Sequence, residues 1–375
     1  MSAPSVTYDL AIVGGGIVGL AHAYEAASRG LKVVLFDRDT RSNGASVRNF
    51  GFVTITGQPE GDTWRRARAS REVWAKITAA ADIPVHHRGL TLLTHSAEAR
   101  TVIEEFAAGP MGEGCRVMDP KEAAEFCPGA RSERLTGALY SPHELRVESR
   151  EAVHQVAAWL VETMGVTVIR PTTVLKVAPP VIETSLGRFT AKQAVVCPGH
   201  DFVTLFPDVI ARHKPTECKL HMLRVSDPGW RLQAAVMNDL GLTRYLGYAG
   251  CPSLPALRRK LVAEQPAAFD NGIHLIVVQS ADGSLVVGDS HHYGATVDDF
   301  APDHVDDQIL EIARDTLKLD RSRVVERWIG IYASADVPAM IEEAGPDVRV
   351  VVVTSGTGAS TAFGLAQDCL AGLLR

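Results

Sequence analysis

Three glycines and one aspartate near the start of the chain have the spacing of a nucleotide-binding turn. Gly14-x-Gly16-x-x-Gly19 fits the dinucleotide-binding fingerprint, and Asp37 follows eighteen positions after Gly19. Gly14 would allow a tight exit from a strand, Gly16 would let a pyrophosphate approach the backbone, and Gly19 would let a helix pack close to the sheet. The carboxylate of Asp37 would accept hydrogen bonds from an adenosine ribose. The fingerprint predicts a bound dinucleotide, but alone it does not separate FAD from NAD.

The elements around these residues are those that the fingerprint requires. The apolar run 10–13 predicts a strand, and the small residues over 19–27 predict a helix that ends at Arg29-Gly30. A second apolar run, 31–36, leads directly into Asp37. Strand, glycine turn, helix, strand and acid together predict a βαβ unit whose helix directs free N–H groups at the phosphates.

A second unit of the same kind lies at the end of the chain. The run 348–354 reads as a buried strand, Ser355-Gly-Thr-Gly358 follows it, and a small-residue helix is expected over 360–374. The apolar stretch 194–197, followed by Pro198-Gly199, predicts a strand that returns the chain to the nucleotide-binding sheet.

Composition excludes several classes of protein. The 375 residues are 46% hydrophobic and 22% charged, which is ordinary for a globular protein with room for two domains. A net charge of -6 gives no reason to expect a nucleic-acid partner. The six cysteines form no C-x-x-C pair, so neither a zinc site nor a disulfide framework is expected. No apolar run approaches about 20 residues and no basic leader precedes the first strand, so we expect a cytoplasmic protein without a membrane span.

The remaining pattern predicts two domains that alternate along the chain. Helices are expected over 62–81, 148–164 and 303–319, a capped helix at Asp119, and a mostly β region over 216–300 with a hairpin at Asp282-Gly283. The nucleotide-binding domain would be discontinuous, and the two inserts would form a second domain. The predicted ranges are 1–84, 145–215 and 320–375 for the first domain, and 85–144 and 216–319 for the second.

Several short motifs, read in order, resemble one enzyme family. After the fingerprint come Gly44-Ala-Ser-Val-Arg-Asn-Phe-Gly51, Val195-Val-Cys-Pro-Gly199, Trp328-x-Gly330 with Asp336-x-Pro338, and Gly356-Thr-Gly358. Together they resemble the D-amino-acid oxidase (DAO) family of FAD enzymes, which includes glycine oxidase and sarcosine oxidase. The resemblance implies an α/β fold: a Rossmann-type, DAO-like FAD-binding domain and a second α+β substrate domain with an antiparallel sheet.

The same resemblance implies a position for each cofactor contact. The first glycines would bind the pyrophosphate, Asp37 and Arg38 the ribose, and the loop around Ser46 the pyrophosphate and the flavin ring. The turn at 356–359 would point a helix N-terminus at the flavin N1–C2 edge, where reduced flavin carries negative charge. No cysteine or histidine matches a family attachment site, so the FAD is expected to be non-covalent. The expected cofactor residues are Gly14, Gly16, Ile17, Val18, Gly19, Asp37, Arg38, Ala45, Ser46, Asn49, Gly51, Val174, Gly199, Gly356, Thr357, Gly358 and Ala359.

One position departs from the family and bears on the substrate. The family usually carries, after Trp-x-Gly, an arginine that binds a substrate carboxylate; here the corresponding residue is Tyr332, and a phenol cannot supply a bidentate guanidinium contact. The stretches Ala45–Gly51 and Gly288-Asp-Ser-His-His-Tyr293 resemble a narrower, glycine-oxidase-like group associated with bacterial phosphonate catabolism. The substrate-binding candidates are Arg48, Phe52, Tyr245, His291, His292 and Tyr332.

Some basic residues have two interpretations on sequence alone. Either of His291 and His292 would contact substrate or serve as an ordinary structural histidine. The segment with Arg244, Tyr245 and Tyr248 would be an active-site lid or a solvated loop. Lys219, His221 and Arg224 lie in one predicted strand and are predicted to share a face, which would be a basic pocket wall or an exposed surface.

The sequence thus predicts an FAD-dependent oxidoreductase that oxidises the C–N bond of a small amine. The resemblance implies hydride transfer to flavin N5, an imine that hydrolyses to aldehyde and amine, and reoxidation by oxygen or another acceptor. No side chain need act as a catalytic group and no metal is expected. The favoured substrate is an (N-methylated) 2-aminoethylphosphonate. Alternatives are a glycine or D-amino-acid oxidase or dehydrogenase, and a non-catalytic flavin-binding redox sensor; the oligomeric state is left open.

Overall fold

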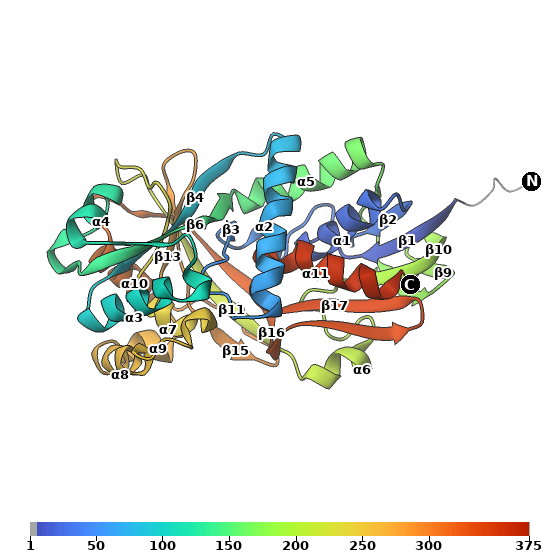
Figure 1. Ribbon diagram of the computed structural model, residues 1–375. Helices are drawn as coiled ribbons and strands as arrows, with labels where there is room; N and C mark the ends of the chain where they lie inside the picture. Colours follow the sequence, from blue (N-terminus) through green and yellow to red (C-terminus); the bar gives the residue numbers. More distant parts are fainter. Residues whose placement is uncertain (1–5, 375) are drawn as a thin grey trace, which may run out of the picture.

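A parallel sheet forms the centre of the first of two lobes. The computed structural model describes residues 6–374; residues 1–5 and 375, which belong to the predicted first domain, lie outside the described part. The two lobes lie side by side along the long axis of the molecule (Figure 1). The strand order in the first lobe is β7-β2-β1-β10-β17, and each neighbouring pair is parallel. These strands are β1 (Thr7–Val13), β2 (Val33–Phe36), β7 (Thr167–Ile169), β10 (Gly187–Val196) and β17 (Val348–Ser355).

Both faces of this sheet are covered, which is why its strands are continuous apolar runs. Helices bury one face in a core that includes Leu20, Leu35 and Phe363. On the other face β8 and β9 extend antiparallel from β10 and enclose a smaller core around Phe36 and Ile182. The covering elements are α1 (Ile17–Ser28), α2 (Asp62–Ala80), α5 (Ser149–Met164), α6 (Pro207–Ile210), α11 (Gly358–Leu373), β8 (Val174–Ala178) and β9 (Val181–Thr184).

The second lobe is built on a mixed, mainly antiparallel sheet. Its order is β5-β6-β4-β12-β13-β14-β11-β16, with β3 beside β6 and β15 beside β11; only β4 and β12 pair in parallel. Its helices pack on the sheet around one large core. The strands are β3 (Phe52–Val53), β4 (Val85–Thr94), β5 (Arg116–Met118), β6 (Gly137–Val147), β11 (Thr216–Val225), β12 (Ala235–Met237), β13 (Ile276–Gln279), β14 (Leu285–Gly288) and β15 (His292–Gly294). The helices are α3 (Ala97–Ala108), α4 (Pro120–Phe126), α7 (Asp239–Arg244), α8 (Leu254–Glu264), α9 (Pro266–Asp270) and α10 (Asp303–Thr316).

One long strand, β16 (Val324–Gly345), joins the two lobes. Its first part, 324–334, pairs with β11 of the second lobe, and its last part, 339–345, pairs with β17 of the first. The predicted domain boundary at residue 320 therefore lies ahead of the place where the strand changes partners. Short 3-10 helices complete the chain at Ala45–Val47, Pro110–Gly112, Ser132–Arg134, Ala211–His213 and Leu246–Tyr248.

Many of the predicted elements are confirmed. The opening strand–helix–strand unit, the helices α2, α5 and α10 and the strand over 194–197 form as expected. Asp119 caps α4 in a full capping box with Glu122. Gly283, at φ +85°, lies in the hairpin between β13 and β14. Across the described residues 6–374, each helix is too short or too polar to cross a bilayer.

The prediction of a mostly β region over 216–300 is wrong for its central part. Residues 239–270 form α7, α8 and α9. Proline occupies the first turn of both α8 and α9, where its missing N–H has no partner to lose. Leu257 and Leu261 of α8 are buried. The hydrophobic pattern of the sequence does not reveal these helices, because each is short and carries only a few apolar positions.

Two glycines of α11 give a matched test of helix packing. A Cβ at Gly364 would lie 2.6 Å from the Cα of Arg66, because α2 crosses α11 there, whereas a Cβ at Gly372 would meet nothing within 4 Å. Gly364→Ala should lower the free energy of unfolding by about 1–3 kcal/mol. Gly372→Ala should leave it unchanged or raise it by up to about 1 kcal/mol. Urea unfolding measures both, and equal stability of the two variants would contradict this packing.

Candidate active site

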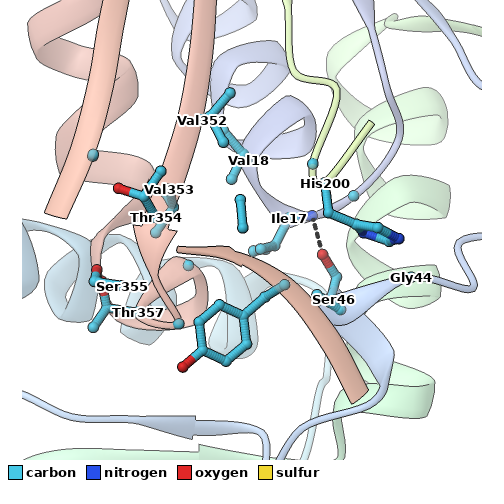
Figure 2. Close-up of a pocket in the computed structure, with 18 of the residues that line it drawn as sticks. Ile17, Val18, Gly44, Ser46, His200, Val352, Val353, Thr354, Ser355 and Thr357 are labelled. Carbon is cyan, nitrogen blue, oxygen red and sulfur yellow. Dashed lines mark hydrogen bonds between the residues drawn. The ribbon is translucent and has the colours of Figure 1, made fainter. Parts of the chain in front are cut away.

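A single large cavity of about 1090 Å³ lies where the two lobes meet. Its lining comes from the turn between β1 and α1, the loop 42–50, the turn between β17 and α11, and the facing residues of β11, β13, β15 and β16. Figure 2 shows the part of the lining that includes Ile17, Ser46, His200 and Thr357. The cavity is therefore continuous from the predicted nucleotide site to the second lobe.

The turn after β1 has the geometry of a phosphate site. Gly14 has φ +104°, and a Cβ there would lie 2.3 Å from the carbonyl oxygen of Cys197; a Cβ at Gly19 would lie 1.9 Å from the carbonyl oxygen of Gly14. Only glycine fits at either position. Gly16 is the N-cap of α1 and makes no side-chain cap, while the N–H of Ile17 donates to Ser46 Oγ at 2.9 Å (Figure 2). The N-terminus of α1 thus faces the cavity with the N–H groups and dipole that a pyrophosphate requires.

The acidic residue at the end of β2 is held in place by backbone groups. Asp37 Oδ2 accepts from the N–H of Gly15 at 2.5 Å, and Oδ1 accepts from the N–H of Asp39 at 2.9 Å. Arg38, its predicted companion, instead donates to Asp201 at 3.0 Å. Asp37, Arg38 and Val174 all line the cavity. A carboxylate fixed beside the glycine turn fits a ribose-binding acid.

The loop 44–51 divides into residues that face the cavity and residues that support it. Asn49 lines the cavity, but its amide also closes the loop: it donates to the carbonyl of Ala45 and accepts from the N–H of Gly51, both at 2.7 Å. Gly51 is not in the lining. It has φ +67°, and a Cβ there would lie 1.8 Å from the carbonyl oxygen of Val147. The expectation that Gly51 contacts the cofactor is therefore corrected: Gly51 packs against β6, behind the loop and outside the cavity lining.

The turn after β17 directs a second helix N-terminus into the cavity. Gly356 has φ +69°, and a Cβ there would lie 3.0 Å from the ring of Tyr332. Thr357 is the N-cap of α11 and has no side-chain cap. The first N–H groups of α11 thus lie in the cavity wall beside Tyr332, where they would stabilise negative charge on a bound ring. Residues 356–359 and Gly199 all line the cavity, as the resemblance implies.

At the second-lobe end, Arg244 extends into the cavity without an acidic partner. Its Nη2 donates to the Tyr293 hydroxyl at 2.8 Å, and among residues 6–374 no carboxylate lies within ion-pair distance of it. Arg244 is exposed in the cavity. Desolvation by the surrounding protein lowers its pKa, but the neighbouring Tyr293 and Tyr332 raise the pKa by more. Burial raises the pKa of Tyr332 well above its ordinary value, so this phenol remains a donor.

Three buried titratable groups lie next to this arginine. Asp289 Oδ1 is 3.3 Å from His274 Nδ1, and Asp289 Oδ2 is 3.9 Å from His291 Nε2. Burial raises the pKa of Asp289 to about 8, against the lowering effect of Arg244. Burial lowers the pKa of His274 to about 3 and that of His291 well below its usual value. Both imidazoles are therefore neutral at physiological pH.

Five of the six substrate-binding candidates line the cavity and one does not. Arg48, Phe52, Tyr245, His291 and Tyr332 are in the lining. His292 is outside it, with its ring 5.8 Å from that of His221. Strand alternation explains the difference, since Tyr293 faces the cavity and His292 faces the other way. The expectation for His292 is corrected accordingly.

The candidate basic groups do not converge on one point. Burial lowers the pKa of His200, and the positive charge of Arg48 nearby lowers it further, so Arg48 lies on the His200 side of the cavity. Lys219 and His221 of the predicted basic wall face away from the cavity, because Leu220 between them faces inward. The prediction that Arg224 shares their face is wrong, since it lies three positions from His221, and Arg224 is also outside the lining. The three side chains pair with carboxylates: Lys219 with Asp298 at 2.7 Å, His221 with Asp306 at 2.8 Å, and Arg224 with Glu326 at 3.3 Å.

Sequence reasoning missed much of the second-lobe end of the cavity. In the stretch Gly288–Tyr293 the sequence pattern indicates the two histidines as candidates, but not Asp289 or Tyr293. It assigns Arg244 only to a lid or a solvated loop, and it gives no indication of His274. A usable signal existed in the alternation of 289, 291 and 293, which places them on one face.

The fold and this cavity define the chain as a dinucleotide-dependent redox protein, and comparison identifies its family. The family model for FAD dependent oxidoreductases (DAO) matches residues 9–371, so the chain belongs to that family. Among curated relatives, glycine oxidase of Geobacillus kaustophilus (strain HTA426) is 28% identical over 206 residues. That match covers 51% of this chain and 54% of the relative, so it spans about half the length of each.

Solved structures agree on the fold. The crystal structure of glycine oxidase from Geobacillus kaustophilus has a TM-score of 0.77 at 21% identity, covering 98% of this chain and 94% of that one. A dithionite-reduced L-alpha-glycerophosphate oxidase from Mycoplasma pneumoniae with FAD bound has a TM-score of 0.74 at 16% identity, covering 99% and 95%. The predicted α/β fold with a DAO-like FAD-binding domain is confirmed. Family membership makes FAD, rather than NAD, the cofactor, and the two helix N-termini and Asp37 fit it.

Removing the Asp37 carboxylate should weaken FAD binding. Asp37→Ala loses hydrogen bonds between a charged acceptor and the ribose, each worth about 1.5–3 kcal/mol. Titration of apoprotein with FAD, followed by flavin fluorescence, should show the dissociation constant rising by about tenfold or more. The exposed Asp208 provides the control, and Asp208→Ala should leave it unchanged. An unchanged constant for Asp37→Ala would mean that this carboxylate does not contact the ribose.

Proposed function

We propose that the chain is an FAD-dependent amine oxidoreductase whose substrate carries an anionic group, most simply an (N-methylated) 2-aminoethylphosphonate. The bound flavin supplies the chemistry by accepting a hydride from the carbon next to nitrogen. The product would be an imine that hydrolyses to aldehyde and amine, and oxygen or another acceptor would reoxidise the cofactor. The protein's own task is to bind the amine, orient it and exclude water.

The observation that carries this proposal is Arg244. Its guanidinium extends into the cavity, bonds only to the Tyr293 hydroxyl, and has no carboxylate partner among the described residues. Arg244 and Tyr293 are both exposed in the cavity, so water solvates the guanidinium until a ligand binds. Guanidinium binds carboxylate or phosphonate oxygens through paired N–H donors, so an anionic ligand would be its counter-ion. The family arginine after Trp-x-Gly is absent, since Tyr332 stands there. Arg244, on α7, supplies a positive group to the same end of the cavity from another element.

The arrangement of donors favours a tetrahedral anion. A planar carboxylate is well served by one guanidinium fork, whereas a phosphonate accepts from several directions. Arg244 approaches from α7, Tyr293 from β15, and Tyr332 from β16. The glycine-oxidase-like stretches at 45–51 and 288–293 support the same substrate class. For these reasons we place the anion of the substrate at Arg244 rather than at Arg48.

Two arginine variants separate these positions. Arg244→Met should raise the apparent Michaelis constant for N-methyl-2-aminoethylphosphonate by about 10- to 100-fold, because a charged hydrogen-bond donor is lost. It should change little for an uncharged amine of similar size. Arg48→Met should have the smaller effect on the phosphonate. If Arg48→Met raises the Michaelis constant for the phosphonate more than Arg244→Met does, the anion lies near His200 instead.

The substrate class is tested by comparing reductants without oxygen. N-methyl-2-aminoethylphosphonate and 2-aminoethylphosphonate should bleach the flavin faster than glycine, sarcosine or D-alanine. Fastest reduction by glycine or D-alanine would establish an ordinary amino-acid oxidase or dehydrogenase. Bound FAD without reduction by any amine would favour a redox sensor.

A further inference from the structure

Asp289 is a buried residue of the cavity wall, and one of its carboxyl oxygens has no hydrogen-bond partner among the described residues. It is 5% exposed, and Oδ1 makes no hydrogen bond. His274 Nδ1, 3.3 Å away, is likewise without a bond, because the two atoms are not aligned for one. A buried polar atom left unpaired is costly, and a buried carboxylate more so. Such an atom in a cavity wall therefore points to a ligand that supplies the missing donor.

Within residues 6–374, no cation is placed to serve as that donor for Asp289. His274 and His291 are neutral, since burial lowers the pKa of both. Arg244 is near enough to lower the pKa of Asp289, but its bond is to Tyr293, outside ion-pair distance of the carboxylate. The backbone of Asp289 is occupied in paired bonds with His274 at 3.0 and 3.3 Å, which fixes the position of the side chain. The side chain is thus held in the cavity wall, with a buried Oδ1 that has no hydrogen-bond donor among the residues described.

The geometry points to Asp289 as the group that binds the ammonium of the substrate and takes its proton. This inference rests on the proposed function and extends it. One N–H bond of the ammonium breaks and one O–H bond forms on Asp289. The electron pair of the broken bond stays on nitrogen, so a cation and an anion become a neutral amine and a neutral acid. The amine then has the lone pair that oxidation at the adjacent carbon requires.

The charge distribution of the cavity wall matches a zwitterion. Arg244 would bind the anionic end and Asp289 the ammonium, and both line the same end of the cavity. A carboxyl whose pKa burial has raised to about 8 is a stronger base than an ordinary carboxylate and suits proton transfer near neutral pH. The titratable and charged groups that face Asp289 are Cys218, Arg244, Tyr245, His274 and His291.

A divalent cation is the rival ligand. One ligand atom from each of His274, Asp289 and His291 lies within 4.8 Å of the others, a combination that transition metals accept. The positive charge of Arg244 beside these three residues repels a divalent cation more strongly than a monovalent ammonium. An ammonium in a molecule that also carries an anionic group is therefore favoured, because the anionic group would pair with Arg244. Titration with Zn²⁺ distinguishes the two ligands.

The binding test uses FAD-loaded protein and an amine that cannot be oxidised. In 2-amino-2-methylpropylphosphonate the carbon next to nitrogen has no hydrogen, so only binding is observed, by calorimetry and by the flavin spectrum. At about pH 7 Asp289 is mostly protonated, so binding of the ammonium must release a proton to buffer; at about pH 9 it is already ionised and none is released. Calorimetry in buffers of different ionisation enthalpy measures this proton.

Asp289→Asn should abolish the proton release and weaken binding by about 10- to 100-fold. The matched control is Asp299→Asn, at an exposed carboxylate outside the cavity lining. This variant should keep the proton release and the affinity of the wild type. Proton release that persists in Asp289→Asn would overturn the inference. So would stoichiometric Zn²⁺ binding that blocks the amine.

The rate of flavin reduction gives an independent readout. In the wild type it should rise as pH increases through about 8, when Asp289 ionises. In Asp289→Asn the rise should move toward about pH 10, where an alkyl ammonium loses its proton in solution. Identical profiles would overturn the inference.

Failure of this inference differs from failure of the proposed function. If Arg244→Met loses the phosphonate while Asp289→Asn binds it normally, the proposed function stands and the role of Asp289 does not. If tert-butylamine binds with Asp289-dependent proton release and the phosphonate does not bind, the phosphonate is wrong and Asp289 still binds an ammonium. If neither probe binds, both are overturned.

Discussion

The change of partner along β16 is the constraint on which the site depends. Residues 324–334 belong to the sheet of the second lobe and residues 339–345 to that of the first, so the two lobes are joined through one continuous strand. The cavity lies where this strand passes between them, with Tyr332 in its wall. The helix N-termini of α1 and α11 face the cavity from the first lobe. Arg244 of α7, Asp289 just after β14, and Tyr293 of β15 line it from the second. This arrangement would bring a cofactor held by one lobe against a substrate held by the other.

Electrostatics divides this cavity into two functions. The first-lobe end offers backbone N–H groups and helix dipoles, which stabilise phosphate charge and the negative charge of a reduced flavin. Within the described residues, the second-lobe end has a guanidinium without a carboxylate partner, Arg244, and a carboxyl oxygen without a hydrogen bond, Asp289 Oδ1. A ligand that carries both an anion and an ammonium would pair with each of these groups, which is the physical basis for proposing a zwitterionic substrate.

The sequence predicts the parts of the site that local spacing determines. Gly14, Gly19 and Asp37 lie within one βαβ unit, where the required backbone conformations and the close approach to Cys197 follow from residue type. The second-lobe site is different, because its members come from distant segments. Arg244 meets Tyr293 only through the packing of α7, a short helix that the sequence pattern does not reveal. His274 meets Asp289 only through the pairing of two extended segments. Single-sequence patterns do not encode such pairings, although strand alternation does separate His291 from His292.

The account is tested most directly by a crystal structure of the FAD-loaded protein with 2-amino-2-methylpropylphosphonate. The account predicts FAD along the cavity, the phosphonate within hydrogen-bond distance of the Arg244 guanidinium and the Tyr293 hydroxyl, and the amine nitrogen beside the Asp289 carboxylate. A phosphonate bound at Arg48 and His200, with the nitrogen away from Asp289, would contradict it.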